Sequence, residues 1–138
     1  MLDEVDLRIL RHLIEDSARS HKEIGKLVHL TGQAVGARVR KLQDCGAIEG
    51  YTVRWNPEAI GRTVHGFVTV FLKSGLAHHA FQSFVERRDD VEEMHRVSGE
   101  GCYWMRVRVA STAELNAFLD ELLDYGNYKL SLSIARVK

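Results

Sequence analysis

The sequence predicts an α+β protein of two domains, a helix-turn-helix of the winged type followed by a ferredoxin-like βαββαβ domain. Two observations predict this fold. Residues 20–50 contain two short helical patterns separated by a tight turn, and residues 64–137 follow the order β-α-β-β-α-β of a split βαβ unit. The only proline, Pro57, lies with Gly61 between these patterns and marks a boundary. The expected parts are a helix-turn-helix domain over residues 1–55, a linker over 56–62 and a ferredoxin-like domain over 63–138.

The first helix is expected over residues 3–16. Asp3 is a good N-cap, and the acidic residues of the first turn favour the positive end of the helix dipole. Apolar residues recur at helical spacing and form one inward stripe of Leu7, Leu10, Leu13 and Ile14. We expect this helix to pack behind the two that follow and to complete their core.

The next two helices carry signals at both ends. Ser20 and Glu23 form a capping-box pattern, and Thr31 is a good N-cap for the second helix. His29-Leu30 is the expected turn, and Gly46 is the expected stop. The apolar stripes are Ile24, Leu27 and Val28 in the first helix and Val35, Val39 and Leu42 in the second. This spacing is typical of a helix-turn-helix.

The opposite face of the second helix is the candidate DNA-reading surface. At about 100° per residue, Gln33, Ala37, Arg40 and Asp44 lie roughly opposite Val35. Gln33 could pair with an adenine edge, and Arg40 with a guanine edge or a phosphate. The small residues beside them read few bases, so shape and phosphate contacts are expected to carry much of the binding. The candidate DNA-binding residues are Lys22, Thr31, Gly32, Gln33, Gly36, Ala37, Arg38, Arg40 and Lys41.

The charge of this region supports the same interpretation. From Arg19 to Lys41, six basic residues stand against one acidic residue, Glu23, a local charge of +5 in a chain whose 19 basic and 19 acidic residues cancel. A basic segment in a neutral protein is the electrostatic footprint of a nucleic-acid-binding face. The alternative is a solvated surface on an ordinary helical hairpin, which the capped spacing disfavours.

Strand-like and helical segments complete the chain. Residues 47–55 are rich in β-branched and aromatic residues and predict one strand, the basis for a winged variant. In the second domain, strands are expected over 64–73, 91–97, 102–110 and 128–137, and helices over 76–88 and 112–125. Residues 98–101, with two glycines, are expected to form the turn between the second and third strands.

One face of the predicted sheet needs a partner. Both helices of a split βαβ unit cover the same face of the sheet, which leaves the other face open in a monomer. That open face includes Phe67, Phe71 and Trp104, and an exposed apolar patch usually marks an interface. We expect the chain to dimerise through these residues, which would place two reading helices on a roughly palindromic DNA site.

Composition and motifs argue against several other classes of protein. No apolar run is long enough to span a membrane, and the first residues, MLDEVDLR, are not a secretory signal, so we expect a cytoplasmic, nucleoid-associated protein. Cys45 and Cys102 lack the spacing of a metal site, and the seven histidines suggest no ligand set. The sequence contains no evident nucleophile–base arrangement, so we expect neither an enzyme nor a bound metal or cofactor.

Short motifs recur in a fixed order along the chain. They are Leu2-Asp3 with Asp6 and Ile9-Leu10; Asp16-Ser17-Ala18-Arg19-Ser20; Arg38-Val39-Arg40-Lys41-Leu42; Gly46-Ala47-Ile48 with Gly50-Tyr51; and Asn56-Pro57 with Ile60-Gly61. In this order the chain resembles the Lrp/AsnC (feast/famine) transcriptional regulators over almost its whole length. The resemblance implies a regulator that binds double-stranded DNA and is built from dimers, often assembled into tetramers or octamers.

The resemblance also implies that effectors, commonly amino acids, bind between C-terminal domains near the loop that joins the second and third strands. That loop comprises Ser98, Gly99, Glu100, Gly101, Cys102 and Tyr103. Gly99, Glu100 and Tyr103 match the family's pattern, whereas Cys102 stands where an aspartate is common. A thiol replaces poorly the attraction of a carboxylate for an ammonium group. The alternative is a tight hairpin turn that binds nothing.

Two functions follow from these patterns. The first is a sequence-preferring, oligomeric transcriptional regulator, modulated by an amino-acid-like effector. The alternative is an architectural protein that wraps or bends DNA with low sequence specificity and no effector, which the glycine-rich reading face and Cys102 favour. A specificity ratio of about 10³ or more for a preferred site over random DNA would identify the regulator.

Overall fold

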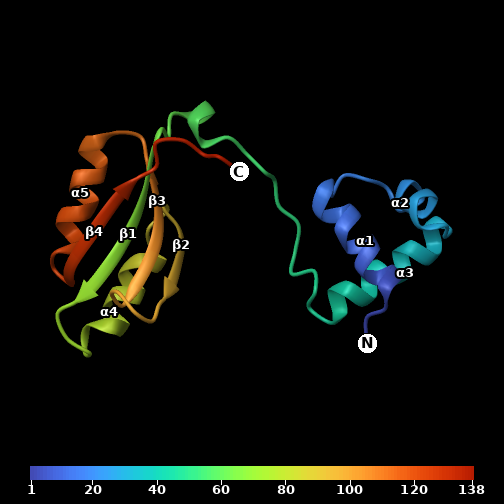
Figure 1. Cartoon of the computed structure of the whole chain (residues 1–138), viewed down its shortest axis with the longest axis horizontal. Helices are drawn as coiled ribbons and strands as arrows, with labels where there is room; N and C mark the ends of the chain where they lie inside the picture. Colours follow the sequence, from blue (N-terminus) through green and yellow to red (C-terminus); the bar gives the residue numbers. More distant parts are fainter. The chain divides into compact units, whose positions relative to one another are not determined.

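The computed structural model describes all 138 residues, and the chain divides into two compact units, Met1–Arg54 and Trp55–Lys138. The first unit contains helices only, and the second contains a sheet with helices packed on it (Figure 1). Each unit has its own hydrophobic core. None of the helices combines the length and the apolar content that a membrane span requires.

The first unit is built from three helices, α1 (Glu4–Glu15), α2 (His21–Val28) and α3 (Gly32–Asp44). Their buried side chains form one core of Ile9, Leu13, Ile24, Val28, Val35, Val39 and Leu42. Six of these seven positions confirm the predicted apolar stripes, and Ile9 is a core residue that the predicted stripe of the first helix did not include. Three residues expected to face inward are instead exposed, Leu7 by 37%, Ile14 by 75% and Leu27 by 45%, because each short helix meets its neighbours along only a narrow stripe.

Side-chain caps begin all three helices. Ser20 and Thr31 each accept a hydrogen bond from the backbone N–H three residues later, at 3.0 and 3.1 Å. The reciprocal bond expected from Glu23 does not form, so the capping box at Ser20 is half complete. A full box forms at α1, where Asp3 accepts from the Asp6 N–H and Asp6 accepts from the Asp3 N–H, both at 2.9 Å.

A tight turn joins α2 to α3. His29 ends α2 in the left-handed conformation with φ of 59°, and the Leu30 N–H donates to the Gly25 carbonyl at 2.9 Å. A Cβ at Gly25 would lie 2.4 Å from the Leu30 carbonyl oxygen, so a side chain there would collide with the backbone of the turn. This contact fixes how closely α3 follows α2.

The strand predicted over residues 47–55 does not form, so the first unit has no wing. Residues 49–55 have no regular secondary structure, and their backbone groups make no hydrogen bond to other backbone groups of the chain. A strand needs a neighbour to satisfy its backbone, and the first unit contains no second strand. Tyr51, Val53 and Trp55, which predicted the strand, are 54%, 74% and 49% exposed. A short 3₁₀ turn, η1 (Pro57–Ile60), follows with Asn56 as its cap.

The second unit is a four-stranded antiparallel sheet with two helices. The elements are β1 (Val64–Leu72), α4 (Ala77–Glu86), β2 (Val91–Arg96), β3 (Tyr103–Val109), α5 (Thr112–Leu122) and β4 (Gly126–Leu132). The strands lie in the order β2-β3-β1-β4, and every neighbouring pair is antiparallel. The predicted βαββαβ order is confirmed.

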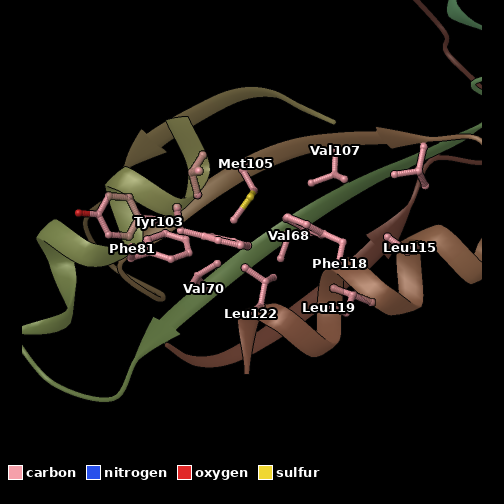
Figure 2. Close-up of a cluster of buried hydrophobic side chains, with 13 residues drawn as sticks. Val68, Val70, Phe81, Tyr103, Met105, Val107, Leu115, Phe118, Leu119 and Leu122 are labelled. Carbon is pink, nitrogen blue, oxygen red and sulfur yellow. The ribbon is translucent and has the colours of Figure 1, made fainter. Parts of the chain in front are cut away.

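Helices α4 and α5 cover one face of this sheet, and the core lies between them and the strands (Figure 1). Alternate residues of the central strands point into it, as the predicted two-residue period requires. Figure 2 shows these side chains packed against Phe81 of α4 and Phe118 of α5. The buried hydrophobic side chains of the strands are Val68, Val70, Tyr103, Met105, Val107 and Val109.

The last strand begins and ends earlier than predicted. β4 starts at Gly126, where a Cβ would lie 2.0 Å from the Phe71 carbonyl oxygen. Beyond Leu132 one further backbone bond forms, from the Ser133 N–H to the His65 carbonyl at 2.8 Å. Because β1 begins at Val64, which the register places opposite residue 134, the alternating residues after 134 have no further residues of β1 to pair with.

Candidate DNA-binding interface and effector loop

The four sides of α3 face four different surroundings. Its apolar side, Val35, Val39 and Leu42, is buried in the core. One flank carries Arg38 and Lys41 and meets α1, and the other carries Gly32 and Gly36 and meets α2. The remaining side carries Gln33, Ala37, Arg40 and Asp44, all exposed. This outward side is the one that the sequence predicted for DNA.

The two glycines of α3 have an interhelical role. A Cβ at Gly32 would lie 3.2 Å from the backbone nitrogen of Lys22, and one at Gly36 would lie 3.0 Å from Nδ1 of His21. Both distances are tighter than ordinary packing. The glycines therefore let the start of α2 approach α3 closely, which accounts for their presence without any DNA contact.

Two of the predicted DNA-binding cations are held by α1. Nη1 of Arg38 lies 2.7 Å from both carboxylate oxygens of Asp3 and 3.0 Å from Oδ1 of Asp6. Nζ of Lys41 lies 2.7 Å from Oδ2 of Asp6. The Asp6 side chain is fully buried, whereas those of Arg38 and Lys41 remain 30% and 41% exposed. We call these four residues the α1–α3 ion cluster.

Both carboxylates of the ion cluster are held in the ionised form. The hydrogen bond from Lys41, helped by the Asp3 N–H and by Arg38, outweighs burial and sets the pKa of Asp6 far below its ordinary value. The hydrogen bond from Arg38 lowers the pKa of Asp3, and the same contact raises the pKa of Arg38. The two carboxylates therefore carry full negative charge at neutral pH and neutralise two cations of α3.

The remaining basic residues of the helix-turn-helix divide into paired and unpaired groups. Arg19 pairs with Glu15 at 3.1 Å and donates to the His12 carbonyl at 3.0 Å. Lys22, Lys26 and Arg40 form no salt bridge and are exposed. The local charge of +5 thus overstates the charge available to a ligand. Thr31 of the predicted set caps α3 with its hydroxyl.

The predicted effector loop, residues 98–103, is a tight turn packed on β1. Gly99 and Gly101 have φ values of 89° and 78°, which side-chain-bearing residues rarely adopt. A Cβ at Gly101 would lie 2.5 Å from Cγ2 of Thr69, and the Cys102 N–H donates to the Val70 carbonyl at 2.7 Å. The backbone of this loop therefore has a defined shape.

Two charged or polar side chains of the loop are on its surface. Ser98 and Glu100 are exposed, and Glu100 forms a salt bridge with Lys129 of β4. Cys102 is half-buried and its thiol is free. The loop thus offers one carboxylate, already paired, and a partly covered thiol.

Tyr103 belongs to the core and not to the exposed side of the loop. Its side chain is 1% exposed. Its hydroxyl accepts from Nε2 of Gln82 at 2.7 Å and lies 2.9 Å from Nδ1 of His78, both on α4 (the ring of Tyr103 is labelled in Figure 2). The ring is enclosed and its hydroxyl joins α4 to β3, while a contact between Tyr103 and an effector stays a prediction.

The open face of the sheet carries the aromatic residues that the sequence placed there. Phe67 of β1 stacks on Trp104 of β3, with ring centroids 5.8 Å apart and planes 13° apart. Nζ of Lys129 lies 5.8 Å from the centre of the Phe71 ring. These aromatic residues are half-buried within the single chain, while their counterparts on the helical side are fully buried.

Sequence reasoning missed the residues that act across elements. Asp3 and Asp6 were recognised as helix-start residues, but their pairing with cations more than thirty positions away has no local signal. The same holds for His78 and Gln82, which the pattern of α4 gave no reason to separate from other polar positions. No group of three or more His, Cys, Asp or Glu side chains is arranged to hold a metal ion.

Comparison with known families and proteins gives consistent matches to both units. A model of the AsnC-type helix-turn-helix domain matches residues 2–43, and a model of the Lrp/AsnC ligand binding domain matches residues 65–138. The HTH-type transcriptional regulator LrpB of Bacillus subtilis is 40% identical over 137 residues, which cover 99% of this chain and 91% of LrpB.

Solved structures show the same architecture. Bacillus subtilis LrpC has a TM-score of 0.94 at 25% identity, covering 100% of this chain and 98% of that one. A Neisseria meningitidis transcriptional regulator, solved as a complex with L-Met, has a TM-score of 0.94 at 24% identity, covering 100% of this chain and 93% of that one. At that identity the second likeness speaks for the fold alone.

Proposed function

The chain belongs to the Lrp/AsnC family of transcriptional regulators, and on this premise we propose that it is a sequence-preferring, oligomeric regulator that reads double-stranded DNA with α3. The observation that carries the proposal is the outward side of α3, where Gln33, Ala37 and Arg40 are exposed on a helix capped at Thr31. Gln33 and Arg40 have the side chains that pair with adenine and guanine edges in a major groove.

The test of DNA binding begins with the full chain and a pool of random duplexes. An enriched duplex and a random duplex are then compared by fluorescence anisotropy between about 50 and 200 mM salt. A regulator binds the enriched duplex about 10³-fold or more tightly than the random one. No binding to any duplex, or equal binding to both, would contradict the proposal.

A substitution locates the interface on α3. Arg40→Ala should weaken binding and lower the slope of log K against log salt by about 0.9 if Arg40 contacts a phosphate. An unchanged slope with altered sequence preference would mean that Arg40 reads a base. Lys73→Ala is the matched control, since Lys73 is an exposed cation of the second unit outside any salt bridge. A change in neither quantity would remove Arg40 from the interface.

A second candidate function is the architectural one. The outward side of α3 offers only two hydrogen-bonding side chains besides Asp44, and Ala37 between them contributes a methyl group. Such a face fits a groove while reading few bases, which favours shape-based binding. The specificity ratio from the same anisotropy measurement distinguishes the two, because an architectural protein falls far below 10³.

We propose further that an amino-acid-like effector binds beside the 98–103 loop. The L-Met complex of the Neisseria meningitidis neighbour motivates an amino acid as the first class to try. The Glu100 carboxylate is exposed in the loop, and a ligand's ammonium group would replace Lys129 as its partner. Cys102 and Tyr103 have no direct part in this proposal, because one is a partly covered thiol and the other is enclosed.

A thermal-shift screen of the twenty amino acids tests the effector proposal. A ligand that binds the folded state raises the melting temperature by mass action. A hit that Glu100→Gln abolishes, and that Glu114→Gln on α5 leaves intact, supports a site at the loop. A hit that both variants retain places the effector elsewhere, and the absence of any hit contradicts the amino-acid class.

The proposed oligomer rests on two surfaces. The open face of the sheet holds the Phe67–Trp104 stack, and residues 49–55 hold a row of backbone groups without hydrogen-bond partners in the chain. A second copy would cover the aromatic face and could pair with the extended segment. The relatives named above are transcriptional regulators, which favours a binding role over a catalytic one.

A further inference from the structure

Asp6 is the centre of the α1–α3 ion cluster. Its buried carboxylate accepts hydrogen bonds from Arg38, from Lys41 and from the Asp3 N–H, at 3.0, 2.7 and 2.9 Å. A buried carboxylate without such partners would be strongly destabilising, so Asp6 holds its cations firmly. Arg38 is held twice, because it also contacts both oxygens of Asp3.

We infer that Asp6 is a positioning residue for DNA recognition, which turns Arg38 and Lys41 toward α1 and keeps both cations off the phosphates of bound DNA. The inference rests on the proposed DNA-binding function and specifies which basic residues serve it. The cations of the helix-turn-helix left for phosphates are then Lys22, Lys26 and Arg40, which form no salt bridge.

The carboxylates and the DNA compete unequally for these cations. Asp6 is shielded from water, so its attraction for Lys41 and Arg38 is little screened by dissolved salt. A DNA phosphate is solvated, and its attraction for a cation falls steeply as salt rises. Moving either cation to DNA would also leave the charge of Asp6 less compensated inside the protein. The internal partner therefore retains both cations.

This arrangement lowers the affinity for DNA of any sequence. A phosphate contact strengthens binding to every duplex alike, because phosphates carry no sequence information. Withholding two cations lowers the affinity for random DNA and leaves Gln33 and Arg40 on the outward side of α3 with a larger share of the binding. Asp6 thus lowers the affinity for every duplex without touching DNA, and it leaves the ratio of specific to random binding unchanged.

The test is a cycle of variants of the full chain, read by the salt dependence of binding to a random duplex. Asp6→Asn keeps the size of the side chain and an oxygen to cap α1, but removes the charge. For Asp6→Asn we expect the slope of log K against log salt to steepen by about 0.9 for each cation released. Each such step is about a 3.5-fold additional loss of affinity between 50 and 200 mM salt. The specificity ratio should stay the same, because the specific and the random duplex gain the same phosphate contacts.

The salt slope of Lys41→Gln, measured with and without Asp6, is a quantity that a purely structural role of Asp6 would not change. In the native background it should leave the salt slope unchanged, because Lys41 is already occupied by Asp6. In the Asp6→Asn background it should lower the slope by about 0.9, because Lys41 then reaches phosphate. A lowered slope for Lys41→Gln in the native background would overturn the inference, and this arm remains decisive if circular dichroism shows that Asp6→Asn is unfolded.

Failure of the inference can be distinguished from failure of the proposed function. A native chain that binds no duplex contradicts the function itself. The native chain can bind DNA, and Arg40→Ala can reduce its salt slope, while folded Asp6→Asn keeps the native slope. That combination of results overturns only the role of Asp6.

Discussion

Gly25 is the residue on which the shape of the helix-turn-helix depends most directly. A Cβ there would lie 2.4 Å from the Leu30 carbonyl oxygen, and that carbonyl belongs to a turn already closed by the Leu30 N–H bond to Gly25. We expect Gly25→Ala to lower the free energy of unfolding by about 2 kcal/mol through overpacking. Urea unfolding followed by circular dichroism measures it.

Gly50→Ala is the matched control for that substitution. No atom lies within 4 Å of a Cβ at Gly50, and its backbone is not left-handed, so its unfolding free energy should change by less than about 0.5 kcal/mol. If the two alanine variants unfold at the same urea concentration, the close approach at Gly25 does not constrain the turn.

Asp6 should make the first unit sensitive to acid. Its pKa in the folded chain is below the ordinary value of 3.8, so folding favours the ionised carboxylate. The stability that it contributes is therefore fully present above about pH 4 and is lost as the pH falls from there through the lower folded-state pKa. Urea midpoints measured between pH 5 and pH 2 should fall less for Asp6→Asn than for the native chain. If the urea midpoints of the two proteins fall equally with pH, the ion cluster adds no such stability.

At the scale of elements, the junction of α4 with β3 depends on the Tyr103 hydroxyl. That group is buried and bonded to Gln82 and His78. Tyr103→Phe removes the hydroxyl that Gln82 and His78 contact, and it should lower the free energy of unfolding by about 1 kcal/mol. Tyr128→Phe is the comparison, because the Tyr128 hydroxyl forms no hydrogen bond with another residue. Equal melting temperatures for the two variants would count against the junction.

Most elements could be predicted from the sequence because their signals are local. The caps at Ser20 and Thr31 and the two-residue alternation of β1 and β3 depend on neighbours a few positions away. The strand over residues 47–55 was wrong for the opposite reason. Its composition suits a strand, but a strand also requires a partner, and propensity cannot say whether the chain supplies one.

The candidate site shows the same division between local and distant information. Helical periodicity placed Gln33 and Arg40 on the outward side of α3 correctly. It could not show that Arg38 and Lys41 are occupied by Asp3 and Asp6, since no local pattern joins residues that far apart. Charge counted along a segment therefore measures the basic residues present and not those free to bind.

For the whole molecule, the aromatic face of the sheet decides whether the chain assembles. Trp104→Glu places a charge beside Phe67 on the proposed dimer interface, where a buried unpaired charge is costly. We expect sedimentation velocity to show a shift toward monomer and anisotropy to show weaker binding to a palindromic duplex, because two linked reading helices bind more tightly than one.

His79→Glu is the control for assembly. His79 is exposed on α4, a helix that covers the opposite face of the sheet, so the same added charge should leave sedimentation unchanged. If Trp104→Glu is folded by circular dichroism and sediments like the native chain, the aromatic face is not the interface.

The bond between Asp3 and Arg38 has a practical consequence for how this chain is handled. It anchors the first residues beside α3, while Met1 itself is fully exposed. A purification tag or a fluorophore fused ahead of Met1 would therefore emerge next to the reading helix, and its charges would add to the measured salt dependence. Immobilisation through the other end, where Ile134 and Val137 lie exposed after β4, attaches the label to the second unit instead of to the unit that carries α3.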